Sequence, residues 1–188
     1  NLILSFCLDY SFEDVNSTSP TFGEVIGPSY FLNQDKLTIT YFGWETWGGW
    51  RGMFAQLCEM SNDNAWDTDK AVLVGLGNGT GGNGGLQGMT GSQGVNSAWV
   101  QDPNLDTWAE FLGSSSSPRK QIVLLDKDLN KRYQFGPYGG DTIGDNGEEG
   151  AIEEILAAIE ELISEMSILQ GDMNEDQILN VQDIIIIV

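Results

Sequence analysis

The sequence contains no histidine, only 8 lysines and arginines, and only two cysteines among its 188 residues. Without an imidazole, the chain cannot carry a Ser-His-Asp triad, a histidine general base, or the histidine ligands of most zinc and haem sites. Its 28 aspartates and glutamates give a formal net charge of −20, which disfavours a nucleic acid or an anionic membrane as partner. No run of about 18 apolar residues is present, so no membrane-spanning helix is predicted.

The charge is distributed unevenly along the chain. All 8 basic residues precede position 133, and 13 of the 28 acidic residues follow it, so residues 133–188 carry −13 and residues 1–132 carry −7. Hydrophobic residues make up 40% of the chain, which is enough for one sizeable core with a small appendage. The negative charge suits cation binding, or a secreted protein that stays soluble in saline surroundings.

The cysteines and the chain ends each leave alternatives open. Cys7 and Cys58 form either one disulfide or two buried free thiols. The chain begins at Asn1 rather than at methionine, and Leu2–Cys7 is either the end of a signal-peptide apolar region or a first strand. The apolar run Ile184–Val188 is expected to open an element whose remainder is missing, because such a run without a partner promotes aggregation.

Hydrophobic patterning predicts strands that alternate with helices. Strands are expected at Leu37–Phe42, Ala71–Val74, Ile122–Leu125 and Tyr133–Phe135, and helices at 51–61, 108–112 and 151–166. Residues 75–94 are so rich in glycine that we expect a flexible loop. The G-x-G-x-x-G pattern at 77–82 is therefore not interpreted as a dinucleotide site, since that site needs a helix beginning at the glycines. Periodicity alone supports an α/β fold with helices on the faces of a sheet.

The segment Gly43–Arg51 lies between the strand predicted at 37–42 and the following helix. Sites gather at the carboxyl ends of strands in α/β sheets, and a helix N-terminus stabilises an anion such as a thiolate. Tyr41-Phe42-Gly43, a short loop and X-Gly-X-X-Arg resemble the redox loop of thioredoxin-like proteins, in particular the selenoprotein P-like and peroxiredoxin-like branch of secreted bacterial proteins. The stretches 11–16, 99–102 and 122–126 resemble the same family. The resemblance covers about residues 8–165. It implies a thioredoxin-like three-layer sandwich at 8–166, including the glycine-rich loop 75–94.

This sequence departs from the family at the redox positions. The family has Cys-x-x-Cys or a selenocysteine variant where this chain has Trp47 and Trp50. An indole ring neither forms a disulfide nor acts as a nucleophile, so the thiol–disulfide oxidoreductase chemistry that the resemblance implies is absent from the chain as written. Two interpretations are open. Either the domain is an inactive binding or structural unit, or these positions are cysteine or selenocysteine, because the codons differ by one base and UGA is read differently among organisms.

Other residues around the loop also have two interpretations. Trp44, Trp47 and Trp50 are either aromatic caps on the end of the sheet or an exposed platform on which a sugar or peptide stacks. Cys58, two helical turns beyond Trp50, is interpreted as a core residue rather than a resolving thiol. The resemblance makes Pro118 a candidate for the cis-proline that thioredoxin-like proteins carry beside the active loop.

Oxygen-bearing side chains recur at regular spacing near the C-terminus. Counted from Asp172 as position 1, the residues at positions 1, 3, 5, 9 and 12 are Asp172, Asn174, Asp176, Asn180 and Asp183, and Ile178 at position 7 offers its backbone carbonyl. This spacing lets a tight loop surround a hard cation with oxygens, as Ca²⁺ requires. The pattern resembles one repeat of a type I dockerin. The resemblance implies a short C-terminal dockerin/EF-hand-like calcium loop at 167–188, calcium as cofactor, and a cohesin-like or cell-surface protein as partner.

Two features of this loop differ from the dockerin pattern. Gln177 occupies the position of the sharp-turn glycine and would have to adopt a left-handed conformation. A dockerin has two repeats, whereas this partial repeat is alone and truncated. The alternative interpretation is an Asx-rich surface turn without a metal.

Three functions follow from these patterns. The first is a secreted, periplasmic or cell-surface thioredoxin-like oxidoreductase with a calcium repeat, in which positions 47 and 50 are in fact cysteine or selenocysteine. The second is an inactive thioredoxin-like module within a larger extracellular assembly, anchored by the calcium repeat. The third is an unrelated enzyme that uses paired carboxylates, although no acidic pair lies in a context that marks it out.

Overall fold

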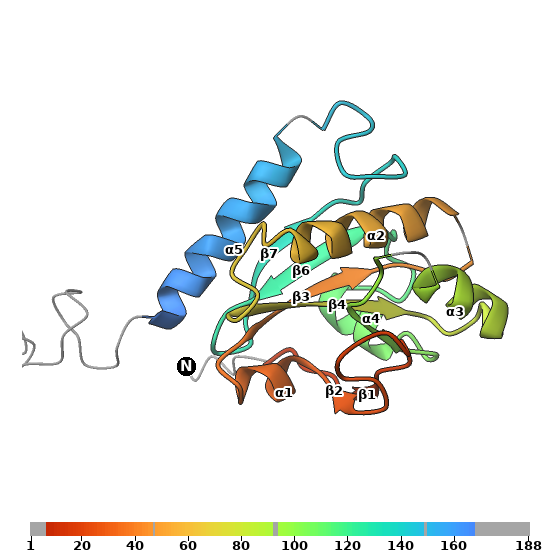
Figure 1. Cartoon of the computed structure of the whole chain (residues 1–188), viewed down its shortest axis with the longest axis horizontal. Helices are drawn as coiled ribbons and strands as arrows, with labels where there is room; N and C mark the ends of the chain where they lie inside the picture. Colours follow the sequence, from red (N-terminus) through yellow and green to blue (C-terminus); the bar gives the residue numbers. More distant parts are fainter. Residues whose placement is uncertain (1–6, 47, 92–93, 149, 168–188) are drawn as a thin grey trace, which may run out of the picture.

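A five-stranded sheet forms the centre of the molecule in the computed structural model, which describes residues 7–46, 48–91, 94–148 and 150–167 (Figure 1). Its strands are β3 (Leu37–Phe42), β4 (Ala71–Gly77), β5 (Ala98–Gln101), β6 (Gln121–Leu125) and β7 (Lys131–Phe135). They are arranged in the order β5-β4-β3-β6-β7. The β3, β4 and β5 strands are parallel, whereas β6 and β7 are antiparallel to their neighbours. β1 (Phe12–Glu13) and β2 (Val25–Ile26) form a separate antiparallel pair.

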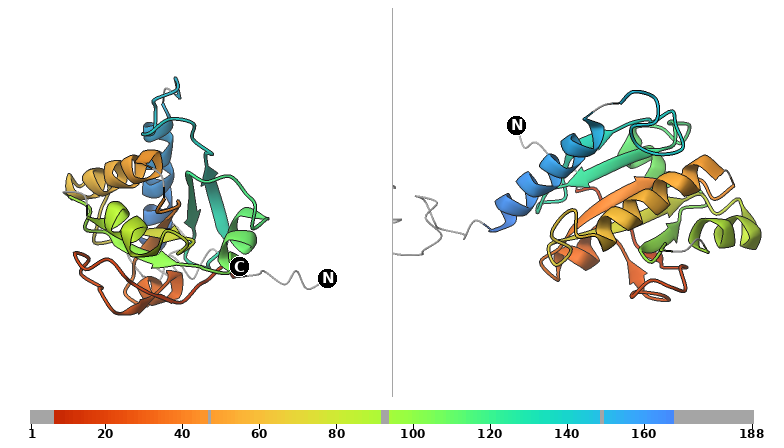
Figure 2. Two further views of the ribbon diagram at one scale, coloured as in Figure 1. Left: turned by 90° about the vertical axis from the view of Figure 1, so that its right-hand side faces the viewer. Right: turned by 45° about the horizontal axis from the view of Figure 1, so that its top comes forward.

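Helices cover both faces of the sheet and complete three layers (Figures 1 and 2). The helices are α1 (Pro28–Leu32), α2 (Gly48–Asn62), α3 (Gly82–Thr90), α4 (Asp106–Leu112) and α5 (Ala151–Ser167). One core cluster joins α2, α3 and α5 to one face of the sheet, and a second joins α1 and α4 to the other face. All 6 residues of β3 are buried because both faces of this central strand are covered. No helix within the described ranges is long and apolar enough to cross a bilayer.

The predicted elements of the sheet are confirmed. The strands expected at 37–42, 71–74, 122–125 and 133–135 and the helices expected at 51–61, 108–112 and 151–166 are all present, most of them a few residues longer than expected. Hydrophobic patterning did not predict the edge strand β5, nor β1, β2 and α1. β1, β2, α1 and β5 are 2, 2, 5 and 4 residues long, which is too short to show a periodicity.

The prediction of a loop throughout residues 75–94 is wrong, because Gly82–Thr90 is the helix α3. Met89 is fully buried in the core. The glycines bring the helix close to the 43–51 segment: a Cβ on Gly88 would lie 2.2 Å from the Arg51 guanidinium, and one on Gly85 would lie 3.2 Å from Cβ of Glu45. Tertiary packing therefore outweighs the low helix propensity of glycine.

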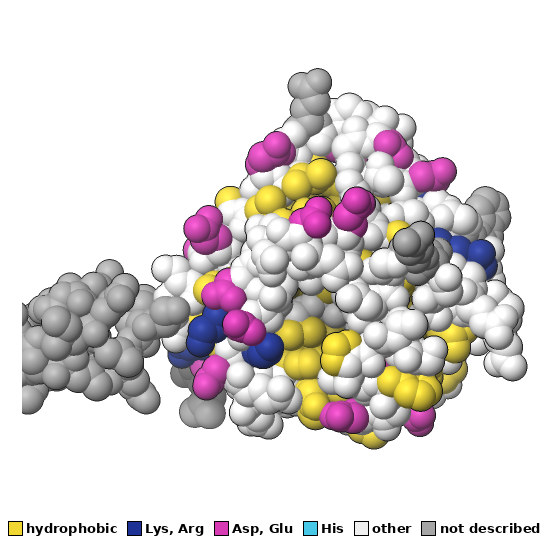
Figure 3. Space-filling model, in the orientation of Figure 1, with side chains coloured by type: hydrophobic (Ala, Val, Ile, Leu, Met, Phe, Trp, Pro, Cys, Tyr) yellow, Lys and Arg dark blue, Asp and Glu magenta, His cyan; other side chains and the backbone are white. Residues whose placement is uncertain are grey.

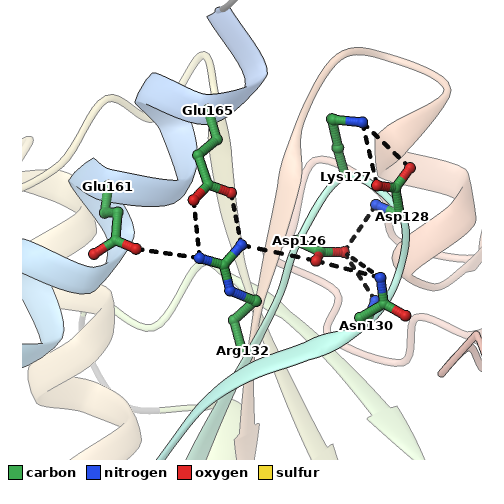
Figure 4. A network of polar contacts seen from close by, with 7 residues as sticks. All are labelled: Asp126, Lys127, Asp128, Asn130, Arg132, Glu161 and Glu165. Carbon is green, nitrogen blue, oxygen red and sulfur yellow. Dashed lines mark hydrogen bonds and ion pairs between the residues drawn. The ribbon is translucent and has the colours of Figure 1, made fainter.

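An ion-pair network fastens α5 to the β6–β7 hairpin (Figure 4). The guanidinium of Arg132 donates to Glu165 at 2.7 and 2.8 Å and to Glu161 at 3.2 Å. Asp126 lies 3.9 Å from the same guanidinium and accepts hydrogen bonds from the backbone of the turn after β6. The hydrogen bonds from Arg132 lower the pKa of the Glu165 carboxyl. Elsewhere acidic side chains are spread over the visible surface rather than gathered in one patch (Figure 3).

Candidate functional site

The segment from Gly43 to Trp50 connects the carboxyl end of β3 to α2, where sequence analysis placed the site. The Gly43 amide donates to the Leu76 carbonyl of β4 at 3.1 Å, and Trp50 lies in the first turn of α2. The Tyr41 hydroxyl donates to the Trp50 carbonyl at 3.0 Å, and burial raises the pKa of this hydroxyl, which keeps it a donor. Trp47 lies outside the described residues.

Two tryptophans and an arginine pack together over this end of the sheet. The rings of Trp44 and Trp50 meet edge to face with centroids 5.5 Å apart. Cζ of Arg119 lies 3.1 Å from the ring centroid of Trp44 and 6.0 Å from that of Trp50. Both rings are half-buried, and burial lowers the pKa of the Arg119 guanidinium. The arginine covers Trp44, so the arrangement of these two rings is that of a cap rather than of an open stacking platform.

Glu45, which sequence analysis did not single out, joins the loop to three other elements. Its side chain is fully buried. Oε1 accepts hydrogen bonds from the Gly79 amide at 3.2 Å, Trp99 Nε1 at 3.1 Å and Gln101 Nε2 at 3.2 Å. Its backbone carbonyl accepts two bonds from the Arg51 guanidinium, at 3.0 and 2.7 Å. Oε2 has no hydrogen-bond partner in the described part of the chain. The signal available in the sequence was a carboxylate placed between Trp44 and Trp47.

The position of Glu45 also shows why the G-x-G-x-x-G pattern at 77–82 is not a dinucleotide site. A helix does follow the glycines, contrary to the sequence-based reason for rejecting a dinucleotide site. However, the Gly79 amide donates to the Glu45 carboxylate, and a Cβ on Gly77 would lie 2.2 Å from Oε1 of that carboxylate. The glycines therefore make room for an anionic side chain of the chain itself, in the place where a pyrophosphate would have to approach.

The assignment of Pro118 as a cis-proline is wrong. Within the described ranges, the cis peptide bond joins Gly136 to Pro137. The residue immediately before β6 is Lys120, whose amide donates to the Phe42 carbonyl at 2.9 Å and whose φ is +62°. A proline can supply neither that N–H group nor that backbone angle. The ammonium of Lys120 donates to the Gly140 carbonyl beside the start of α2.

The two cysteines are free and lie away from the loop, so the disulfide alternative is wrong. Cys58 is fully buried on the core side of α2, and burial raises the pKa of its thiol. Cys7 is exposed, with Sγ 3.6 Å from the Asp128 carbonyl, so only one of the two thiols is buried. Neither thiol stands where a redox loop needs one.

We expect native protein to react with one equivalent of DTNB, at Cys7, and unfolded protein to react with two. Cys58 is fully buried on the core side of α2, and its raised pKa lowers the fraction of this thiol that is ionised to the thiolate. The measurement is absorbance at neutral pH with and without guanidinium chloride, with Cys7→Ser as the matched control. No native reaction of the wild type, or rapid reaction of the Cys7→Ser variant, would contradict this placement.

The predicted calcium ligands Asp172, Asn174, Asp176, Ile178, Asn180 and Asp183 all lie outside the described residues. In the ranges that are described, no three Cys, Asp or Glu side chains are placed to share a metal ion. The described residues form surface grooves of about 480 and 500 Å³; the first has no carboxylate in its lining and the second has only Glu59. Neither groove offers the paired carboxylates of the third function.

Among the comparisons with known proteins, only the one with solved structures finds matches, and these agree on the fold. No family model and no curated protein matches the sequence. Among solved structures, the chain is similar to a candidate protein disulfide isomerase from Bacteroides thetaiotaomicron, with 17% identity, a TM-score of 0.59, and coverage of 82% of this chain and 86% of that one. It is similar to the peroxidoxin BcpB from Mycobacterium tuberculosis, with 12% identity, a TM-score of 0.58, and coverage of 82% and 93%.

A third similar structure is a secreted disulfide oxidoreductase of Mycobacterium tuberculosis homologous to Escherichia coli DsbE. It has 13% identity and a TM-score of 0.53, with coverage of 77% of this chain and 95% of that one. At these identities the likeness concerns the fold alone. The chain therefore has a thioredoxin-like fold, the fold type of thiol–disulfide oxidoreductases, as the resemblance of the 43–51 segment implied.

Proposed function

We propose that this chain is a thioredoxin-like module of a secreted protein that binds a partner rather than exchanging disulfides. The observation that carries the proposal is the place of Trp50. It lies in the first turn of α2, packs edge to face on Trp44 at 5.5 Å and contacts the core, while both thiols of the chain lie elsewhere. A tryptophan built into the packing in this way favours a true tryptophan over a misread cysteine codon, because a cysteine would leave that volume empty.

The secretion of the module and its attachment through the calcium loop are supported by other observations. The name of one similar structure describes a secreted protein, and the high negative charge suits the same setting. The ligand types at 172–183 fit Ca²⁺, which would order a loop that presents the chain to a cohesin-like or cell-surface protein. Asp172, Asp176 and Asp183 would supply the carboxylate ligands.

The direct test of this proposal is the reduction of insulin by dithiothreitol. We expect the native protein to leave the rate at the uncatalysed value, because no thiolate is available at the start of α2. An equal concentration of the Cys58→Ser variant is the control for any contribution of the buried thiol. Acceleration by the wild type above the uncatalysed rate would overturn the assignment of a non-redox module, unless the Cys58→Ser variant lost that acceleration and so assigned it to the buried thiol.

A second prediction concerns the calcium loop. Calorimetric titration of the whole chain with Ca²⁺ is expected to show one site, and Asp172→Ala is expected to weaken binding by at least about tenfold because it removes the first ligand. Asp145→Asn, at an exposed carboxylate in the described part of the chain, is the matched control and should bind as the wild type does. Absence of a Ca²⁺ heat, or equal effects of the two variants, would leave residues 172–183 as an Asx-rich turn.

A further inference from the structure

A groove of about 480 Å³ lies at the opposite end of the sheet from the 43–50 loop. It is formed where α1, the end of α2 and the starts of β4 and β5 meet, with Ala71–Leu73 among the residues of its wall. Its volume falls within the range of small-molecule sites, about 300–1,000 Å³. Nothing in the proposed function of the module uses this groove.

The charge of the groove is opposite to that of the molecule. The chain carries 28 acidic residues, yet no aspartate or glutamate lines the groove, and its charged lining residue is Lys36. The Lys36 ammonium donates to the Thr68 carbonyl at 3.3 Å, which fixes its position and uses one of its three N–H groups. The groove therefore offers one positive charge where the rest of the molecule repels anions.

The remaining polar groups both donate and accept hydrogen bonds. Four side-chain amides line the groove, from Gln34, Asn62, Asn64 and Asn96. Asn96 donates to Asn62 at 2.9 Å and Asn62 donates to the Gly94 carbonyl at 3.1 Å, so this pair is held in place. Within the described residues, the side chain of Asn64 has no such bond. Amides that donate and accept match ligand hydroxyl groups, each of which also does both.

We propose that this groove binds a sugar acid, a hydroxyl-rich ring that carries one carboxylate. The Lys36 ammonium pairs with the carboxylate, and the amides of Asn64 and Asn96 hydrogen-bond the ring hydroxyls. The apolar side chains of β4 in the wall, Val72 and Leu73, contact the carbon atoms of the ring. A peptide is less suited, because the edge of β5 beside the groove is already paired: the Asn16 side chain donates to the Ser97 carbonyl, and the Val15 amide donates to the Trp99 carbonyl. Among the lining residues, those with an amide or a hydroxyl outnumber the apolar ones.

The probe for this proposal is D-glucuronate, followed by the side-chain amide signals in ¹⁵N–¹H NMR spectra of the full chain. We expect saturable shifts of Asn62, Asn64 and Asn96, with a dissociation constant on the order of 1 mM. Lys36→Met should weaken glucuronate binding about tenfold and leave the weaker binding of D-glucose unchanged. Lys127→Met, at an exposed lysine outside the groove, should bind both sugars as the wild type does.

A second variant tests whether lost binding comes from a missing side chain rather than from misfolding. Asn64 has a φ of +55°, so Asn64→Gly removes the amide at a backbone angle that glycine adopts freely. It should weaken binding of glucuronate and glucose alike. The proposal is overturned if glucuronate gives no saturable shift, if acetate binds as tightly as glucuronate, if the shifts fall at the 43–50 loop, or if only a peptide binds the groove.

Discussion

Replacement of Glu45 by leucine should lower the free energy of unfolding by about 3 kcal/mol, and the thermal midpoint by about 10 °C. The leucine removes the acceptor of three hydrogen bonds, so the Gly79 amide, Trp99 Nε1 and Gln101 Nε2 lose their partner, and Trp99 Nε1 loses it in the buried interior. This carboxylate joins the loop to the β4–α3 connection and to β5, so its loss weakens the contacts between these three segments. Urea unfolding followed by tryptophan fluorescence and by circular dichroism measures the effect.

Glu45→Gln is the matched control for that experiment. It keeps Oε1 as the acceptor of the three bonds, and it replaces Oε2, an atom without a partner among the described residues, by an NH₂ group. We therefore expect the glutamine variant to lose only about 1 kcal/mol. Equal losses in the two variants would show that the charge of Glu45, and not its role as an acceptor, stabilises the site. A leucine variant as stable as the wild type would contradict the whole arrangement.

The second large effect is a gain of activity. The double variant Trp47→Cys/Trp50→Cys should reduce insulin with dithiothreitol, whereas the wild type should not. The exchange puts Cys-Gly-Gly-Cys at the start of α2, where the helix dipole favours a thiolate, and the Arg119 guanidinium lies 6.0 Å from the ring of Trp50. The fold type of thiol–disulfide oxidoreductases is already present around these positions.

Trp47→Ser/Trp50→Ser is the control for this gain. It removes the same two rings and leaves a similar cavity at position 50, yet it supplies no thiol. Activity in the cysteine variant alone would show that the loop has kept a redox geometry and lacks only sulfur. A folded cysteine variant that stays as inactive as the serine variant would show that packing around Trp44 and Arg119 no longer holds the loop in that geometry.

The sequence predicted the sheet well because its strands have strong patterns. β3 is a run of β-branched and aromatic residues covered on both faces, and α5 repeats its apolar residues with helical spacing. It failed for α3, because what makes Gly82–Thr90 helical is close packing against Glu45 and Arg51, contacts that are distant in sequence. It failed for Pro118 because the backbone bond that Lys120 makes to Phe42 has no local signal.

The sequence located the candidate site correctly but identified only some of its residues. The position of the 43–51 segment between β3 and α2 follows from the local pattern. The hydrogen-bond partners of Glu45 instead come from the β4–α3 connection and from β5, and Arg119 comes from the segment before β6. Such convergence depends on strand order, which periodicity does not encode. The calcium loop at 172–183 stays a prediction from ligand spacing.

The most direct measurement is mass spectrometry of the peptide that spans residues 44–51 of the native protein, read beside its codons. We expect tryptophan at both 47 and 50, and with it a loop without redox sulfur. Cysteine or selenocysteine at these two positions would contradict the proposed non-redox module and make the domain a thiol–disulfide oxidoreductase.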